Sequence, residues 1–305
     1  MRARTLASLP QPDRCRHPGG VDTVRAMTPD MTVVVASRNR RDDLHATLPR
    51  HTAPVIVVDN DSADDSVDVC RAAGPHVRVI PLEENLAARA RTVGARAATT
   101  ELVAFADDDS WWEPGALELA ARLFEQHPRL GLIAGTILVG PDDEPDPINT
   151  VLATSPLGTE PGAPGPALLG FVGCGAIVRR SAFLDVGGFD DVIRFPGEEE
   201  RVALDLVDAG WQVCHVPEVI AHHHPSVVRD VAGVRQAGLA RSRLLTAVLR
   251  LPLPEVLAEA RRCLHTTTGR RGLVTALPRI PAAWAARRPV GPDVLRARAR
   301  LRGAT

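Results

Sequence analysis

Short apolar runs, each followed by polar residues and then by a helical pattern, dominate residues 31–110. Four runs are predicted to be strands, at residues 32–36, 55–58, 77–80 and 102–106, and the first and last of them are expected to be buried. Helices are expected between them, through about residue 48, over 64–73 and over 85–99. This alternation is typical of βαβ units, so the fold class is predicted to be α/β, with an open, mostly parallel sheet and helices on both faces.

The pattern is less regular over residues 111–226. A helix is predicted over 115–126, a strand over 130–138, and a glycine-interrupted strand over 170–180. Residues 140–167 are rich in Pro, Gly and acidic residues, so we expect a mobile loop of the length of an active-site lid. A helix beginning near residue 196 is expected to end at Gly210, and a strand over 211–216 to end at Pro217.

The two ends of the chain differ from this central region. Residues 1–30 lack apolar periodicity and the hydrophobic core of a signal peptide, so a disordered extension is expected. Residues 227–305 alternate arginine with Leu, Val and Ala at helical spacing and are interrupted by prolines. They are predicted to form a basic, amphipathic helical appendage that rests on the body of the protein or on a membrane surface.

Composition limits the class of protein. The chain has 305 residues, and its longest apolar run, 168–178, is too short and too rich in glycine to span a bilayer. The five cysteines are scattered and form no CxxC pair, which favours reduced thiols and a cytoplasmic location.

The charge is distributed unevenly. From Arg229 onward sixteen arginines face four acidic residues, a net charge of +12, while the whole chain is −1, so residues 1–228 carry −13. A basic end on an acidic body indicates contact with an anionic surface, such as the inner face of the cell membrane. A solvated helical face in a chain without lysine is the alternative. Trp284 is the one aromatic residue of this basic region, which disfavours nucleic-acid binding.

Three aspartates, Asp107, Asp108 and Asp109, follow directly on the apolar run at 102–106. Ligands of open α/β sheets bind beyond the carboxyl ends of the strands. Adjacent carboxylates repel one another, and a hard divalent cation relieves that repulsion, so Mg²⁺ or Mn²⁺ with a substrate phosphate is expected here. Side chains alternate along extended chain, so Asp107 and Asp109 can share one site while Asp108 faces away. A solvated turn that caps the next helix is the alternative.

Two further clusters are candidates for chemistry. Glu198, Glu199 and Glu200 open a helix, where acidic residues suit the macrodipole, but three in a row exceed what capping needs. Three consecutive histidines occupy positions 222–224, and at most two of them can bind one metal ion. The preceding strand can return to the sheet edge near Asp109, which favours a ligand role over a solvated loop.

Two nucleotide-binding classes are disfavoured. No GxGxxG follows the first strand and no GxxxxGK[ST] is present, which argues against a dinucleotide oxidoreductase and a P-loop phosphotransferase. A bound nucleotide would then be held by side chains such as Asp59.

These motifs together resemble the family 2 glycosyltransferases, inverting nucleotide-sugar enzymes with the GT-A fold, over residues 31–226. Residues 33–40 are similar to the first strand and nucleobase loop of that family, and residues 57–62 to the second. The helix from Asn85 resembles the one whose arginine lies near the diphosphate. Residues 107–109 fit the metal triplet, and residues 186–190 the acceptor-side signature. The resemblance divides the domain into a nucleotide-sugar half, 31–110, and an acceptor half, 111–226.

The resemblance implies roles for individual residues. The donor-binding residues would be Ser37, Arg38, Asn39, Asp59, Arg91, Asp107 and Asp108. The metal ligands would be Asp107, Asp109 and His222, with Mg²⁺ or Mn²⁺ as cofactor. The general base would be Glu199, or Glu200 if the register shifts by one. Glu stands where most members have Asp, Ala87 where Gly is usual, and Thr92 where Asn is common.

The implied reaction is the metal-dependent transfer of a sugar, with inversion, from a nucleoside diphosphate to a hydroxyl of a glycan, a lipid-linked acceptor or a small molecule. Two other classes stay open. A sugar-phosphate nucleotidyltransferase would need a glycine-rich basic loop after the first strand, which residues 37–40 lack. A non-catalytic protein that binds nucleotide-sugars or glycans would keep the acidic edge without transferring a sugar.

Overall fold

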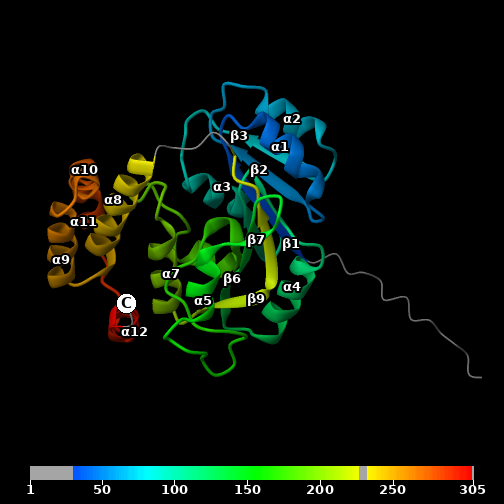
Figure 1. Ribbon diagram of the computed structural model, residues 1–305. Helices are drawn as coiled ribbons and strands as arrows, with labels where there is room; N and C mark the ends of the chain where they lie inside the picture. The colour runs from blue at the N-terminus through cyan, green and yellow to red at the C-terminus, as the bar shows by residue number, and fades with distance from the viewer. Residues whose placement is uncertain (1–29, 227–231, 304–305) are drawn as a thin grey trace, which may run out of the picture.

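The computed structural model describes residues 30–226 and 232–303. The expected extension at 1–30 therefore lies almost wholly outside the described residues. The strands of one nine-stranded sheet have the spatial order β3-β2-β1-β4-β8-β6-β9-β5, with β7 paired to β6 (Figure 1). Their bounds are β1 (Met31–Ser37), β2 (Val55–Asp59), β3 (Val77–Pro81), β4 (Leu102–Ala106), β5 (Ser110–Trp112), β6 (Leu130–Val139), β7 (Glu144–Pro145), β8 (Ala176–Arg179) and β9 (Gln212–His223).

The first half of the sheet is the predicted parallel one. β1 pairs in parallel with both β2 and β4, and β2 pairs in parallel with β3. Every residue of β2 and β4 is buried, because helices cover both faces of these strands. The α/β class and the strand positions read from the apolar runs are confirmed.

Helices on both faces enclose two apolar cores. They are α1 (Arg41–Thr47), α2 (Ser66–Ala72), α3 (Arg89–Ala97), α4 (Ala116–Gln126), α5 (Pro147–Ala153), α6 (Arg180–Asp185) and α7 (Glu199–Asp208), with 3₁₀ turns at Leu48–Arg50 and Gly173–Gly175. One core packs Leu44 and Leu117 against β1 and β4. The other packs Phe183 and Val202 against the opposite face. The two cores fix the strand ends relative to one another.

The second half of the sheet is mixed, and here β9 differs from its predicted length. β8 is antiparallel to β4 and β6, while β9 runs parallel to β6 and antiparallel to β5. β9 passes through Pro217 and continues to His223, because the pairing with β6 is shifted between Ala134 and Thr136. Gly135 permits the close approach, since a Cβ there would lie 2.3 Å from the Val219 carbonyl oxygen. Proline is tolerated at such an irregularity, where no ladder hydrogen bond is needed from it.

Residues 140–167 contain more regular structure than the expected mobile loop. β7 pairs with the end of β6, and α5 begins at Pro147, capped by the Asp146 carboxylate, which accepts a hydrogen bond from the Ile148 N–H at 2.9 Å. The Asn149 side chain bonds both the N–H and the C=O of Ile137, at 2.9 and 2.8 Å. The high Pro, Gly and acidic content therefore reflects turns and caps.

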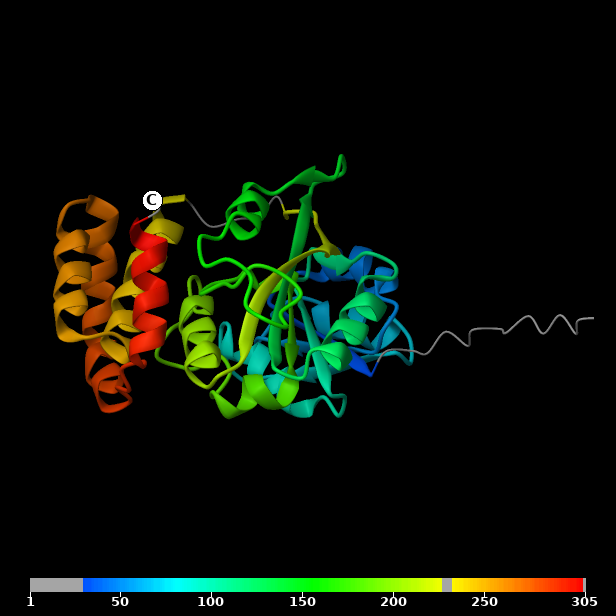
Figure 2. The same cartoon turned by 90° about the horizontal axis from the view of Figure 1, so that it is seen from below.

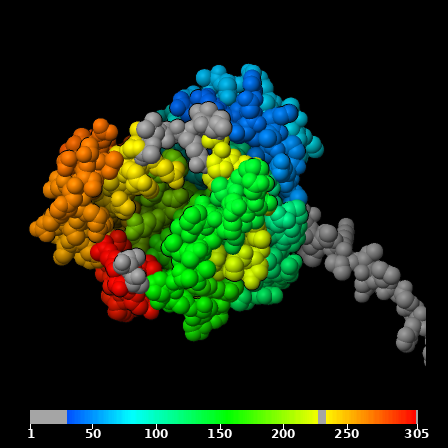
Figure 3. All heavy atoms as spheres, in the orientation of Figure 1, coloured from blue at the N-terminus to red at the C-terminus, as the bar shows by residue number. Residues whose placement is uncertain are grey.

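The basic C-terminal region forms helices, as predicted. They are α8 (Ala232–Arg250), α9 (Leu253–Leu264), α10 (Thr267–Ala276), α11 (Ile280–Ala285) and α12 (Pro292–Gly303), with a 3₁₀ turn at Leu277–Arg279. They form a layer beside α7 (Figures 1 and 2) and meet the sheet domain along one side of the molecule (Figure 3). Arg250 on α8 donates to the Asp205 carboxylate on α7, with 2.9 Å between Nη2 and Oδ2. Within the described residues, no helix is both long and apolar enough to cross a membrane.

Candidate functional site

The aspartate triplet lies in the turn between β4 and β5. Ser37, at the end of β1, donates a hydrogen bond to Asp108 Oδ2 at 2.9 Å, which holds this carboxylate against β1. Burial raises the pKa of Asp108 to about 7, and the charges of Asp107 and Asp109 add to the effect. The turn thus concentrates negative charge at the carboxyl end of the sheet, where α/β folds bind ligands.

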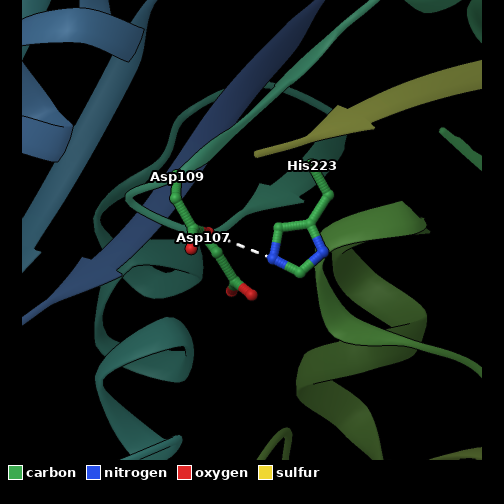
Figure 4. A group of neighbouring side chains, drawn as sticks. All are labelled: Asp107, Asp109 and His223. Carbon is green, nitrogen blue, oxygen red and sulfur yellow. Dashed lines mark ion pairs between the residues drawn. The ribbon is translucent and has the colours of Figure 1, made fainter. Parts of the chain in front are cut away.

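A histidine from β9 faces two of these aspartates. His223 lies opposite Ser110 in the antiparallel pair of β5 and β9, and its Nε2 is 3.3 Å from Asp109 Oδ1. One ligand atom each from Asp107, Asp109 and His223 lies within 4.8 Å of the others (Figure 4). Two carboxylates and an imidazole are a donor set that Mg²⁺ or Mn²⁺ accepts.

The neighbouring histidine, His222, was expected to be the ligand but faces the opposite side of β9. Its Nδ1 lies 2.8 Å from Asp143 Oδ1, its Nε2 bonds the Glu113 carboxylate, and its ring stacks on Trp111 at 5.2 Å. Adjacent residues of a strand point to opposite faces, so one position along the strand decides which histidine meets Asp109. The structure brings His223, and not His222, to the aspartates.

Arg91 on α3 links the triplet to the glutamates of α7. Its guanidinium is buried, donates through Nη2 to Asp107 Oδ1, and has Nη1 3.8 Å from Glu198 Oε1. Burial alone would lower its pKa, but the carboxylates of Asp107 and Glu198 outweigh burial and raise it. The backbone at Gly173 lies against the side chains of Arg91 and Glu199, since a Cβ at Gly173 would be 3.6 Å from the guanidinium carbon and 3.8 Å from Glu199 Oε1.

The three consecutive glutamates have three different surroundings. Glu198 is buried behind Arg91, and burial with the Glu199 charge raises its pKa to about 8. Glu199 lines the cavity in front of the triplet, and burial raises its pKa, with Asp107 contributing. Glu200 points to the C-terminal helices, where its Oε1 accepts from Arg298 Nη2 at 3.1 Å. Among these three side chains, Glu199 is the one that lines the cavity.

In the loops after β1 and β2, some polar side chains line the cavity and others form hydrogen bonds within the loops. Ser37 and Arg38 line the cavity. Asn39 instead accepts a hydrogen bond from the Ala63 N–H at 2.8 Å, with a positive φ of 54°. Asp59 is buried and accepts from the N–H and the hydroxyl of Ser62, at 3.0 and 2.5 Å. Asn39 and Asp59 therefore fix the loops that carry the lining residues.

The cavity that these residues share has a volume of about 940 Å³. Its walls also include side chains that the sequence did not single out, namely Arg40, Asn60, Ile148, Phe195 and Arg235. Arg40 and Asn60 stand in the predicted edge loops and could have been proposed from that position. Phe195 and Arg235 come from the α6–α7 connection and from α8, and no local pattern indicates that either reaches the cavity.

Comparison with known proteins gives a match to one family. Residues 32–187 match the family model described as Glycosyl transferase family 2. The pre-mycofactocin glycosyltransferase of Mycobacterium tuberculosis is 30% identical over 209 residues, which are 66% of this chain and 44% of that relative. The N-acetylglucosaminyl-diphospho-decaprenol L-rhamnosyltransferase of the same species is 29% identical over 213 residues, 58% of this chain and 69% of the relative. The chain thus spans less than half of the first relative's length.

Solved structures show the same fold at low sequence identity. S. aureus TarS 1-349 in complex with UDP-GlcNAc has a TM-score of 0.56 and 16% identity, covering 89% of this chain and 88% of that one. GalNAc-T7 with UDP, GalNAc and Mn²⁺ has a TM-score of 0.57 and 13% identity, covering 86% and 55%. With a family match over half of its length and a GT-A-type sheet, the chain belongs to glycosyltransferase family 2.

Proposed function

We propose that this protein transfers a sugar from a nucleoside diphosphate to an acceptor hydroxyl, with a divalent metal ion and with inversion at the anomeric carbon. One observation supports the proposal above all. Arg91, Asp107, Glu199 and His223 come from four separate elements and converge on one cavity of about 940 Å³. Phosphate neutralisation, metal binding and proton transfer are the three tasks of such a reaction, and these side chains match them.

The proposed metal ligands are Asp107, Asp109 and His223. The separation of their ligand atoms, within 4.8 Å, fits a cation with metal–ligand bonds of about 2.0–2.2 Å. When bound, such an ion would act as a Lewis acid on the leaving diphosphate. A solved structure of the same fold, GalNAc-T7, contains Mn²⁺. His222 takes no part in this proposal.

The proposed donor site lies between the loops after β1 and β2 and the triplet. Arg91 would contribute positive charge to the diphosphate, because guanidinium–phosphate pairs form strong, charge-assisted hydrogen bonds. Ser37, Arg38 and Asp108 would hold the ribose side, while Asn39 and Asp59 keep the loops in position. TarS binds UDP-GlcNAc and GalNAc-T7 binds UDP, so we propose a UDP-sugar as the first donor to test.

The proposed general base is Glu199. It must take the proton of the acceptor hydroxyl as that oxygen attacks the anomeric carbon from the face opposite the diphosphate. Burial raises the pKa of Glu199, which strengthens it as a base near neutral pH. A single base on one face requires no covalent intermediate, so the anomeric configuration inverts. Such a base typically contributes about 10²–10⁴ in rate.

The proposed location is the cytoplasmic face of a membrane, reached through the C-terminal helices. Seven of the nine large apolar side chains that are exposed in the described residues lie on α8–α11 or on the 3₁₀ turn after α10: Val234, Leu253, Leu257, Leu264, Val274, Leu277 and Trp284. These helices also carry most of the arginine excess, a combination suited to anionic lipid surfaces. One relative is named for a decaprenol-linked acceptor.

The experiment that tests the function measures UDP release from a panel of UDP-sugars with Mn²⁺ or Mg²⁺. Asp109→Asn and Glu199→Gln are each expected to abolish turnover while the thermal midpoint stays close to that of the wild type. Glu200→Gln is the matched control, since its side chain pairs with Arg298 outside the cavity. Near-normal turnover in Asp109→Asn and Glu199→Gln would overturn the assignment. UDP binding without any transfer would instead favour a non-catalytic binding protein.

A further inference from the structure

A groove between α8 and α10 shares two lining residues with the proposed catalytic cavity. It has a volume of about 620 Å³ and lies between two helices that run side by side (Figures 1 and 2). Phe195 and Arg235 line both the groove and the cavity, and the Arg235 guanidinium lies 5.8 Å from the centre of the Phe195 ring. The groove and the cavity therefore adjoin at these two side chains.

The walls of the groove are apolar and basic. Val234 and Val274 line it while 60% and 63% exposed, and Phe195 is 44% exposed. The two helices pack closely at Gly272, since a Cβ there on α10 would lie 2.6 Å from the Ala237 carbonyl oxygen of α8. Exposed apolar side chains that line a concave surface are typical of a binding site for an apolar ligand.

The charge of the groove has one sign. Four arginines line it, and none of its lining residues in the described part of the chain is acidic. Two of them are held by the protein: Arg241 donates to the Phe195 carbonyl at 2.9 Å and Arg270 to the Leu264 carbonyl at 2.9 Å. Among the described residues, Arg235 and Arg271 form no ion pair with a carboxylate. Their guanidinium groups can each bind an anion.

We propose that this groove binds the apolar chain and the phosphate of an amphiphilic acceptor, whose sugar or hydroxyl end then lies in the cavity near Glu199. The proposal rests on the proposed function, because it names the acceptor class of the same site. Phosphate at Arg235 would lie at the junction of groove and cavity, which keeps the reacting end of the acceptor on the cavity side. The hydrocarbon chain would lie along Val234 and Val274.

The test uses three probes with the full-length protein in titration calorimetry, without donor. Dodecyl phosphate, kept below its critical micelle concentration, offers both chain and charge. Dodecyl maltoside offers the same chain without charge, and inorganic phosphate offers the charge without a chain. We expect dodecyl phosphate to bind most tightly, and shortening it to decyl phosphate to weaken binding by about fourfold per buried methylene.

Two substitutions test the location of the probe. Val274→Asp places a carboxylate on the apolar wall, and Arg271→Glu reverses one unpaired charge; each is expected to weaken dodecyl phosphate binding by about tenfold or more. Both side chains are exposed, so the fold should tolerate the change. Val151→Asp on α5 is the matched control, because Val151 is also exposed, at 62%, but lines neither the groove nor the cavity.

The outcomes separate this proposal from the proposed function. Unchanged dodecyl phosphate binding in both groove variants would overturn the groove as the site. Equal affinity for inorganic phosphate and dodecyl phosphate would indicate an anion site only and would also overturn it. Binding of UDP with Mn²⁺, measured in the same proteins, is expected to be unaffected by Val274→Asp and Arg271→Glu. If the wild type does not bind UDP with Mn²⁺, the proposed function is contradicted, while the result for the groove still stands.

Discussion

At the scale of single residues, adjacent residues of the same type have different surroundings. His223 approaches Asp109 while His222 lies between Glu113 and Asp143. Glu199 lines the cavity while Glu200 pairs with Arg298. Composition cannot distinguish such pairs, because the direction of a side chain depends on the exact position along the strand or helix. Paired substitutions can distinguish them.

The two histidines give the first prediction. His223→Ala is expected to lower Mn²⁺ affinity by about tenfold or more, since losing even an outer partner of a ligand typically costs 10–100-fold. His222→Ala is expected to leave that affinity nearly unchanged and to reduce the free energy of unfolding by about 1–3 kcal/mol, because two hydrogen bonds and the stack on Trp111 are lost. Calorimetric Mn²⁺ titration and urea unfolding measure the two effects. The reverse pattern would assign the ligand role to His222.

His51 gives a prediction for the pH dependence of stability. It is 7% exposed, and neither ring nitrogen has a hydrogen-bond partner in the described part of the chain. Burial lowers its pKa from 6.5 to about 4, and His76 adds to the effect. The unfolded chain therefore takes up a proton at higher pH than the folded one does. Stability should fall as the pH drops from 6.5 towards 4, by about 3 kcal/mol when complete.

His51→Leu tests this sign. The substitution removes the titrating group at a site where no hydrogen bond is lost, so urea unfolding should show a flatter stability profile between pH 6.5 and 4. His45→Gln is the control, because His45 is exposed on the same stretch of chain. Equal acid sensitivity of wild type and His51→Leu would show that other groups cause the loss of stability.

At the scale of elements, the packing of α3 positions Arg91. Gly94 lies one turn after Arg91, and a Cβ there would be 2.4 Å from Val34 Cγ1 and 3.1 Å from Val58 Cγ2. Alanine would gain about 1 kcal/mol of helix propensity. Overpacking typically costs about 1–3 kcal/mol, and the two valines belong to buried strands that cannot move away. The cost of overpacking is therefore expected to exceed the gain in helix propensity.

Gly94→Ala is therefore predicted to lower the free energy of unfolding by about 1–2 kcal/mol. It should also weaken UDP binding, because α3 must shift away from β1 and β2 and takes Arg91 with it. Urea unfolding and UDP titration measure both effects. Gly170→Ala is the control, since nothing lies within 4 Å of a Cβ there. A Gly94→Ala variant more stable than the wild type would show that the helix can adjust.

The elements also show what the sequence could predict. The first four strands and the acidic edge could be predicted from short apolar runs, whose pattern is local; β1, β2 and β4 are buried, and β3 is not. The length of β9 could not be predicted, because proline usually marks a strand end. Only the shifted pairing opposite Gly135 allows the strand to continue past Pro217. For the same reason, the approach of His223, rather than His222, to Asp109 was not predicted. The cavity contacts of Phe195 and Arg235 depend on how separate elements pack, which no local pattern specifies.

At the scale of the whole molecule, the C-terminal helices are part of the folded body. Leu204 on α7 packs with Ala247, Leu251 and Val294 of these helices in one buried cluster. Arg298 connects α12 to Glu200 on α7 and to Glu255 on α9. Deleting residues 229–305 would expose this cluster, so a truncated protein would report on folding as well as on surface contacts. Substitutions on the outer surface test the membrane proposal more directly.

The last prediction concerns that outer surface. Leu257 and Leu264 are 55% and 53% exposed on α9, close to the exposed Arg261. If these side chains enter the headgroup region, the double variant Leu257→Asp/Leu264→Asp should lose most of its co-sedimentation with phosphatidylglycerol vesicles. Higher salt should weaken the wild-type interaction, because arginine contacts with anionic lipid are screened. Val151→Asp, on the exposed face of α5, should sediment as the wild type does. Equal sedimentation of all three proteins would contradict a membrane contact through α9, since Leu257 and Leu264 are its two most exposed large apolar side chains, ahead of Leu253 at 52%.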